Sequence, residues 1–302
     1  MNGKISNMAQ IASVRQYTYT NGRERGISVI DCDNGKIRFL LNASKALDVM
    51  QLFHEGQNMS FLSKNAFTAR ELPFLQRFEG GMLYTCGIDS VGGREGHEIH
   101  GSLHNTPAEV VRAECNEDGI VVEAIMRNTA LFGPNLVFRR RVTSAIGSDT
   151  VNIEDTLTNS GYKTENYSIL YHINVGYPML DEGARVEADV LRADPRTEWS
   201  HKTASDMLTV SDSIVDQEET CYFMALGKPE ACLVNEKIGK KFTVRYSADT
   251  LPHFLEWRSM ASGDYALGLE PCSTELDDRF KYSTVAAGES VKFAVSLSVS
   301  KI

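Results

Sequence analysis

Short runs in which apolar and polar residues alternate cover most of the chain. They are KIRFLL, LDVMQLF, IVVEAIMR, NLVFRRRV, TVNIEDTLTN, NYSILYHINV, KFTVRYS, YALGLEP and VKFAVSLSVS. Each alternates or carries β-branched and aromatic residues, and turn formers such as Asp33-Asn34-Gly35 bound them. A period of two residues is typical of β-strands, whose successive side chains point to opposite faces. The pattern therefore predicts an all-β protein.

Helical content is predicted only between Asn65 and Phe78, and Pro73 interrupts that segment, so any helix there is short. Strands without helices between them cannot form the βαβ units of a parallel sheet, which leaves antiparallel sandwiches or barrels. The sequence shows no Pro-rich or Ser-rich linker and no internal repeat. We expect one large antiparallel β-sandwich domain over residues 1–302, with residues 1–39 contributing N-terminal strands.

The composition is that of a globular protein with an acidic balance. The chain has 302 residues, 42% of them hydrophobic and 24% charged, and is long enough to form one continuous core. Its formal net charge of -9 argues against nucleic acid as a partner, because phosphate backbones are bound by clustered Lys and Arg. The densest basic run, Arg139-Arg140-Arg141, lies within an alternating segment, and we interpret it as a solvated strand face.

The cysteines and the N-terminal segment bear on location. The six cysteines are scattered without a CxxC pair, which favours reduced thiols over a disulfide framework or a zinc site. The first residues, MNGKISNMAQIASVRQYTYTNG, lack the apolar core of a signal peptide, and no run approaches the ~18 apolar residues of a membrane span. We expect a soluble, cytoplasmic protein with no membrane partner, and the sequence does not specify its oligomeric state.

The segment LYHINVGYP places a histidine and an asparagine side by side on one strand face. With a period of two, His172 and Asn174 share a face with Leu170 and Gly176. The opposite face carries Tyr171, Ile173, Val175 and Tyr177. The bulky apolar side is expected to pack in the core. The polar side either meets solvent on the wet face of an antiparallel sheet or contributes to a functional site.

Glu270 ends the nearly all-apolar run YALGLEP and is followed by Pro271, which stops the strand ladder. Partial burial at such a position raises a carboxyl pKa toward the working pH, which makes Glu270 a candidate general base. The alternative is a strand-end glutamate that merely meets solvent.

Three histidines cluster in and near the segment IHGSLHNTPAE: His97, His100 and His104. Such a density suggests a metal site like that of the cupins, which are also β structures. However, cupins present His-x-His on one strand, whereas the spacings here are three and four, and Gly101 and Pro107 break any helix that could align the ligands. We therefore expect no metal, and we keep a metal-dependent, cupin-like sugar isomerase as a rival hypothesis.

Four segments in this order, GGMLYTCGID, HGSLHNTPAE, YHINVGYPML and GDYALGLEP, carry a family resemblance. From about Leu40 to the C-terminus the chain resembles the aldose 1-epimerase (galactose mutarotase) superfamily, and in particular a branch of uncharacterised bacterial proteins. The resemblance implies a large antiparallel β-sandwich of the galactose mutarotase-like type, with a sugar-binding cleft across one curved sheet.

The resemblance also implies residue roles. His100, in the His-Gly dipeptide, corresponds to a histidine that contacts the sugar, His172 to the general acid and Glu270 to the general base. The family's arginine before the His-Gly strand has two candidate counterparts, Lys45 and Arg77.

Two further residues complete the predicted binding site. In the better-known galactose mutarotases, which this chain resembles, the middle histidine is followed after one residue by Tyr-Phe-Asn-Leu. Here Asn174 follows His172 by two residues. Trp257 is expected to provide an aromatic platform for the sugar.

These roles predict an isomerase that interconverts the α and β anomers of an aldose or a related sugar by acid/base ring opening and reclosure. No cofactor is required for this reaction, and the expected partner is a small sugar. The alternative from a different class is a sugar-binding or sensing β-sandwich that keeps the cleft without turnover, since many β-sandwiches bind sugars without transforming them.

Overall fold

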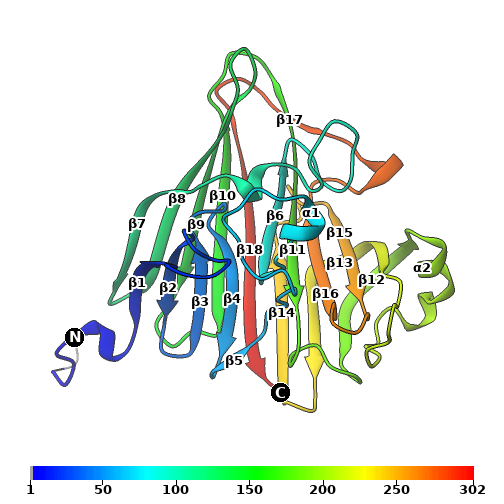
Figure 1. The fold of residues 1–302 in the computed structure, drawn as a ribbon, viewed down its shortest axis with the longest axis horizontal. Coiled ribbons are helices and arrows are strands. Elements are labelled where there is room, and N and C mark those ends of the chain that lie inside the picture. The colour runs from blue at the N-terminus through cyan, green and yellow to red at the C-terminus, as the bar shows by residue number, and fades with distance from the viewer. Residues whose placement is uncertain (1–2) are drawn as a thin grey trace.

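The computed structural model describes residues 3–302 and contains two antiparallel sheets (Figure 1). The smaller, five-stranded sheet has the order β1-β2-β3-β4-β5. Its strands are β1 Ser13–Thr18, β2 Ser28–Asp33, β3 Ile37–Asn42, β4 Asp48–His54 and β5 Gln57–Asn58.

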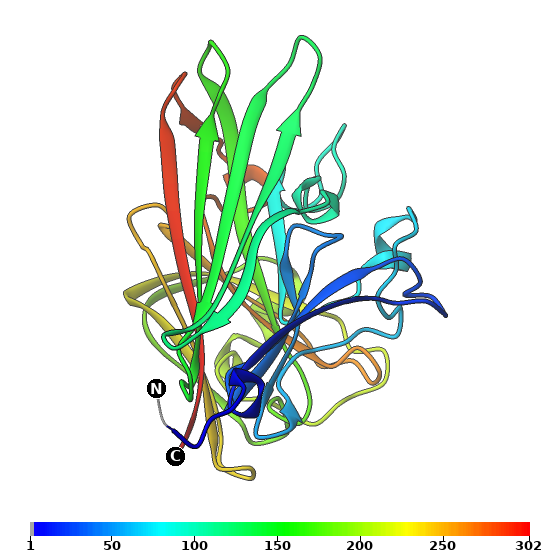
Figure 2. The same cartoon turned by 90° about the vertical axis from the view of Figure 1, so that its left-hand side faces the viewer.

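The larger, 13-stranded sheet has the order β17-β11-β16-β15-β13-β14-β18-β10-β9-β8-β7, with β12 paired to β13 and β6 paired to β11. Its strands are β6 Leu83–Ile88, β7 Glu109–Asn116, β8 Gly119–Thr129, β9 Asn135–Ser144, β10 Thr150–Asn159, β11 Glu165–Val175, β12 Arg185–Pro195, β13 Thr220–Asn235, β14 Lys240–Tyr246, β15 His253–Ser259, β16 Ala266–Cys272, β17 Ser283–Val285 and β18 Ser290–Lys301. Figure 2 shows the smaller sheet, in blue, crossing one face of the long green and red strands.

The main hydrophobic core lies between the two sheets. Phe39 and Leu52 of the small sheet belong to the same buried cluster as Phe138, Val142 and many other residues of the large sheet. Apolar faces of two antiparallel sheets that bury each other in this way form a β-sandwich. The predicted all-β fold class is therefore confirmed.

Helices are short, as expected between Asn65 and Phe78, where α1 covers only Phe74–Arg77 directly after Pro73. A second helix, α2 Glu198–Lys202, was not expected, and the side chain of Thr197 caps it by accepting a hydrogen bond from the backbone N–H of Ser200. The remaining turns are 3-10 helices: η1 Met8–Gln10, η2 Leu103–Asn105, η3 Ala204–Asp206 and η4 Asp277–Arg279. Within residues 3–302 no helix is long and apolar enough to cross a membrane.

Strand β11 is buried on both faces. Tyr171 and Ile173 point into the main core, whereas Leu170 belongs to a second apolar cluster on the other side. The alternation predicted for LYHINVGYP is therefore correct as far as Val175, where β11 ends, but it is wrong for Tyr177, which was expected in the core and is 70% exposed. The wet-face alternative is wrong, because the side of β11 that carries His172 and Asn174 is also covered, leaving these residues 5% and 0% exposed.

The solvated face expected for the basic run 139–141 is wrong for its middle residue. Arg140 points inward and is fully buried, while the side chain of Arg141 is 43% exposed. The Arg140 guanidinium donates through Nε and Nη2 to Asp155, at 2.9 and 2.7 Å, and through Nη1 to Asp48. Asp155 lies on β10 and Asp48 on β4, so one side chain joins the two sheets.

Asp48 begins a further chain of buried ionic contacts. His104 contacts Asp48 through Nδ1 at 2.6 Å and Glu79 through Nε2 at 2.9 Å, and Lys45 donates to Glu79 at 3.0 Å. Burial opposes a charge on His104, but the neighbouring carboxylates of Glu79 and Asp48 outweigh it and raise the pKa of the imidazole. Cations and carboxylates thus alternate through the interior, which compensates each buried charge. We call this set of residues the charge chain: Lys45, Glu79, His104, Asp48, Arg140 and Asp155.

We expect Arg140→Ala to lower the free energy of unfolding by about 3–5 kcal/mol, because it leaves the buried carboxylate of Asp155 without a countercharge and removes one of the two cations that contact Asp48. Arg141→Ala is the matched control: its contacts with Glu123 and Glu154 are near the surface, and its loss should cost at most about 1 kcal/mol. Urea unfolding of both variants measures the difference. Equal losses would contradict the structural role assigned to Arg140.

Candidate active site

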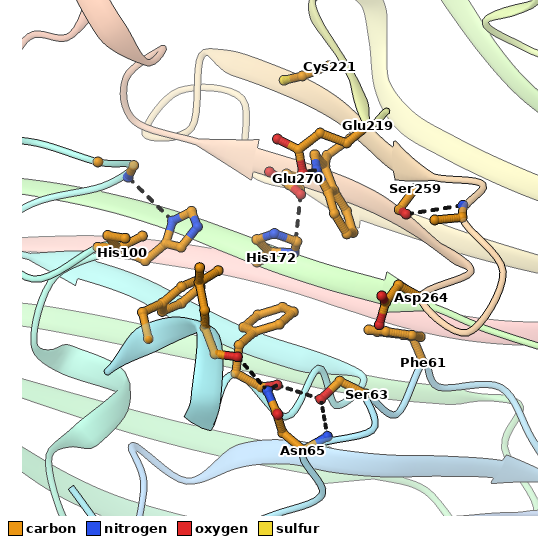
Figure 3. A pocket seen from close by; sticks show the side chains of 18 of the residues that line it. Phe61, Ser63, Asn65, His100, His172, Glu219, Cys221, Ser259, Asp264 and Glu270 are labelled. Carbon is orange, nitrogen blue, oxygen red and sulfur yellow. Dashed lines mark hydrogen bonds and ion pairs between the residues drawn. The ribbon is translucent and has the colours of Figure 1, made fainter. Parts of the chain in front are cut away.

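A pocket of about 610 Å³ opens over β11, β15 and β16 (Figure 3). Strands supply His172, Trp257 and Glu270 to its floor, and the segments before β6 and β7 contribute Phe61 and His100 to its walls. Its size lies within the range typical of small-molecule sites.

His172 and Glu270 face each other on neighbouring antiparallel strands. The pairing of Leu170 with Cys272 and of Ile173 with Leu269 places His172 directly opposite Glu270. The His172 Nδ1 atom lies 3.1 Å from the Glu270 Oε1 atom, and the two residues are 5% and 3% exposed. Neither of these two atoms has an aligned hydrogen-bond partner within the described chain. Two titratable groups are therefore in contact, desolvated and free to exchange a proton with a ligand.

Burial shifts the two groups toward their uncharged forms. It raises the pKa of Glu270 well above its ordinary value, with a smaller contribution from the Glu219 carboxylate, while the positive charge of Arg196 acts in the opposite direction. Burial also lowers the pKa of His172 well below its ordinary value. Both shifts favour the state in which the carboxyl group holds a transferable proton and the imidazole is neutral.

His100 reaches the pocket because Gly101 follows it. A Cβ atom at Gly101 would lie 2.3 Å from the carbonyl oxygen of Ser90 and 2.5 Å from that of Gly87, and the φ of Gly101 is +76°. Only glycine is accommodated there, which explains the His-Gly dipeptide. The His100 ring lies 5.6 Å from that of His172, and burial lowers the pKa of His100 to about 4, so it enters the site as a neutral imidazole.

An aromatic wall adjoins the two histidines. The Trp257 ring lies 5.3 Å from that of His172, and its Nε1 donates to Glu219 at 2.9 Å. Phe78 lies on another side of His172, at 5.7 Å between ring centroids. Rings of this kind can pack against the apolar C–H faces of a sugar while leaving its hydroxyl groups to polar neighbours.

Three predicted binding residues do not line this pocket. Lys45 is bound to Glu79 in the charge chain, and Arg77 donates to Glu98 at 2.8 Å. Asn174 is covered because the backbone N–H of Phe61 donates to its carbonyl oxygen, and its side chain donates to the carbonyl oxygen of His172. These three side chains bind partners elsewhere in the chain and do not line the pocket.

The sequence reasoning missed four charged residues of the pocket: Lys64 and Asp264, which form an ion pair with each other, and Arg196 and Glu219. Arg196 directly follows β12 and Glu219 directly precedes β13, and neither residue belongs to a recognisable motif. For Glu219 one signal was available: the indole N–H of a partly buried Trp257 needs a hydrogen-bond acceptor, and Glu219 provides it.

The three histidines considered for a metal are separated. His97 is exposed and His104 belongs to the charge chain, so only His100 lines the pocket. Among residues 3–302 no group of three or more His, Cys, Asp or Glu side chains is arranged to hold a metal ion. The ligand set proposed for a cupin-like site is therefore not assembled.

Comparison with known proteins gives a family and a fold. The family model described as "Domain of unknown function (DUF4432)" matches residues 24–299. No curated protein matches the sequence at a significant level.

Solved structures share the architecture at low sequence identity. A Klebsiella pneumoniae protein, provisionally described as an aldose 1-epimerase, has a TM-score of 0.87 at 20% identity, with 97% of this chain and 86% of that chain covered. A galactose mutarotase-like protein from Clostridium acetobutylicum has 0.71 at 13%, covering 97% and 100%. Galactose 1-epimerase from Lactobacillus acidophilus has 0.66 at 12%, covering 96% and 99%. The expected resemblance is confirmed, and these structures establish the fold.

We expect the His172 imidazole to remain neutral well below pH 6.5, the approximate pKa of an ordinary histidine, because burial penalises its charged form. Nitrogen NMR of the histidine rings across a pH titration measures this, and the spectrum of His172→Gln identifies the signal. A His172 ring that takes up its proton at or above the ordinary pKa would contradict the desolvated site.

Proposed function

Since the chain belongs to the family described as DUF4432, a domain of unknown function, and has the fold of aldose 1-epimerases, we propose that it interconverts the α and β anomers of an aldose. The observation that carries the proposal is the 3.1 Å contact between His172 and Glu270 in a pocket of sugar-accommodating size.

Anomer exchange needs no net gain or loss of protons. Opening a pyranose removes the proton of the anomeric hydroxyl and delivers one to the ring oxygen. Glu270 and His172 between them hold one proton, so one group accepts while the other donates, and reclosure of the ring restores the starting arrangement. General acid and general base groups typically contribute ~10²–10⁴-fold each.

We assign Glu270 as the base in the ring-opening step and His172 as the acid. The active form has the proton on His172, which leaves the Glu270 carboxylate ready to accept the anomeric proton. Because the two groups are in contact, the proton can move from Glu270 to His172 when the polar hydroxyl groups of a sugar replace the desolvated surroundings. After rotation about the C1–C2 bond, reclosure uses the same groups in reversed roles.

Other residues of the pocket bind and orient the sugar. His100 accepts a hydrogen bond from the backbone N–H of Gly92 at Nδ1, so its neutral imidazole carries the proton on Nε2 and can donate it to a hydroxyl group of the sugar. Trp257, fixed by Glu219, provides a flat surface for the pyranose ring. The reaction needs no cofactor. The six free cysteines are compatible with a reducing compartment, and we place the activity in the cytoplasm.

The pH dependence follows from the two pKa directions. Activity requires one proton shared by the two groups, so turnover falls when the contact gains a second proton and when it loses its last one. The low pKa of His172 places the acid limb below the range of an ordinary histidine. The high pKa of Glu270 places the alkaline limb above that of an ordinary carboxylate.

We expect Glu270→Gln to lower kcat by ~10²-fold or more with a much smaller change in KM, because the amide keeps the shape of the side chain but cannot accept the proton. The alkaline limb should disappear with the carboxyl group. Polarimetry of freshly dissolved D-glucose, D-galactose and D-xylose over a pH series measures both effects.

Glu256→Gln is the matched control for removing a buried carboxyl group. Glu256 is fully buried on neighbouring β15, and burial raises its pKa to about 7, but it does not line the pocket. Its substitution should leave kcat within a few-fold of wild type. If Glu270→Gln behaved like this control on every sugar that wild type turns over, Glu270 would not be the base.

A further inference from the structure

One arginine lies in the wall of the pocket. The described residues that line the pocket include two cations, Lys64 and Arg196. The side chain of Lys64 is 71% exposed and forms an ion pair with Asp264 at 2.7 Å. The side chain of Arg196 is only 26% exposed and lines the same pocket as His100 and Glu270. The two differ in what they can offer a ligand, because only Arg196 is held within the wall.

Arg196 is held in one orientation by contacts from two other parts of the chain. Its backbone N–H donates to the carbonyl oxygen of Cys221 at 2.9 Å. Its guanidinium donates through Nε and Nη2 to the two oxygens of Asp277, at 2.6 and 2.9 Å. These bonds use two of the five N–H donors of the guanidinium, so donors are left for a ligand. A bidentate contact also orients the planar group in advance of binding.

The charge of Arg196 acts on two titratable residues of the pocket, Glu270 and His100. Burial raises the pKa of Glu270, whereas the charge of Arg196 lowers it and so favours the carboxylate form. For His100, burial and the charge of Arg196 both lower the pKa. Lys45 and Arg77, the two cations expected here from the sequence, are bound to Glu79 and Glu98 outside the pocket lining. Arg196 is therefore the cation whose position suits the chemistry.

Resting on the proposed function, we propose that Arg196 is a catalytic residue that donates a hydrogen bond to the anomeric oxygen of the sugar. In the ring-opening step the O–H bond at C1 breaks and its proton passes to Glu270, while the C1 oxygen becomes the carbonyl oxygen. At the same time the bond from C1 to the ring oxygen breaks, and the ring oxygen takes a proton from His172. Negative charge develops transiently on the anomeric oxygen, and Arg196 stabilises it.

The test compares Arg196→Ala and Arg196→Lys with wild type, and Arg279→Ala is the matched control. Arg279 lies in the same short turn as Asp277 and forms an ion pair with Asp194, but it does not line the pocket. Anomer exchange of D-glucose, D-galactose and D-xylose is followed by NMR over a pH series, and thermal melting shows that each variant is folded.

We expect Arg196→Ala to lower kcat by ~10²-fold or more, with a smaller change in KM, because it removes a donor to the developing charge. Its alkaline limb should move to higher pH, because the charge that favours the Glu270 carboxylate is gone. Added guanidinium ion should restore part of its turnover. Arg196→Lys should keep the alkaline limb of wild type, because the positive charge is retained. It should lose turnover, because an ammonium group cannot reproduce the planar arrangement of N–H donors of a guanidinium.

Wild-type turnover and an unmoved alkaline limb in a folded Arg196→Ala variant would overturn the assignment. An equal loss in Arg279→Ala would also overturn it, because the loss would then result from a disturbed turn at Asp277–Arg279 and not from the missing Arg196 guanidinium.

If wild type binds sugars without exchanging their anomers, the proposed function fails. Calorimetric titration of wild type and the variants with these sugars then tests whether Arg196 contacts the sugar. An affinity loss confined to Arg196→Ala supports the contact, and unchanged affinity overturns it.

Discussion

The buried guanidinium of Arg140 is the contact on which the arrangement of this protein depends. It binds Asp48 of β4 and Asp155 of β10, and so holds the small sheet against the large one. The hydroxyl of Tyr171 donates to Asp155 at 2.7 Å, and the next residue along β11 is His172. On one face, the strand that carries the candidate acid is thus hydrogen-bonded to the Arg140–Asp155 ion pair, while its other face forms the pocket floor.

The same covering of β11 gives the site its chemistry. A histidine and a glutamate on an exposed sheet would titrate near their ordinary pKa values of about 6.5 and about 4.3, and both would be charged between these two pH values. Because loops and helix α1 cover this face, His172 and Glu270 are almost completely removed from water and favour their uncharged forms. A single proton shared by two desolvated groups is well suited to a reaction that moves a proton between two oxygens of one sugar.

Local pattern was sufficient to predict the strands, the antiparallel class and the alternation along LYHINVGYP, because these depend on neighbours two residues apart. The ordered motifs also selected His100, His172 and Glu270, which the structure brings to one pocket.

Contacts between distant segments were not predictable in this way. The inward turn of Arg140 depends on carboxylates from two other strands, and the position of Arg196 depends on Asp277, 81 residues later. Lys45 and Arg77 were chosen for their charge, but their charge is satisfied by Glu79 and Glu98. Tertiary packing determines partners of this kind, and the pattern within a run of ten residues does not predict them.

The most direct test of acid/base ring opening uses an aldose that carries a heavy oxygen isotope at C1. NMR resolves the two anomers, and the isotope shift of the C1 signal reports whether the label is retained. The mechanism predicts that wild-type protein interconverts the anomers much faster than the label is lost, because the bond that breaks is the one from C1 to the ring oxygen. Loss of the label at the rate of anomer exchange, or no exchange of any bound aldose, would contradict it.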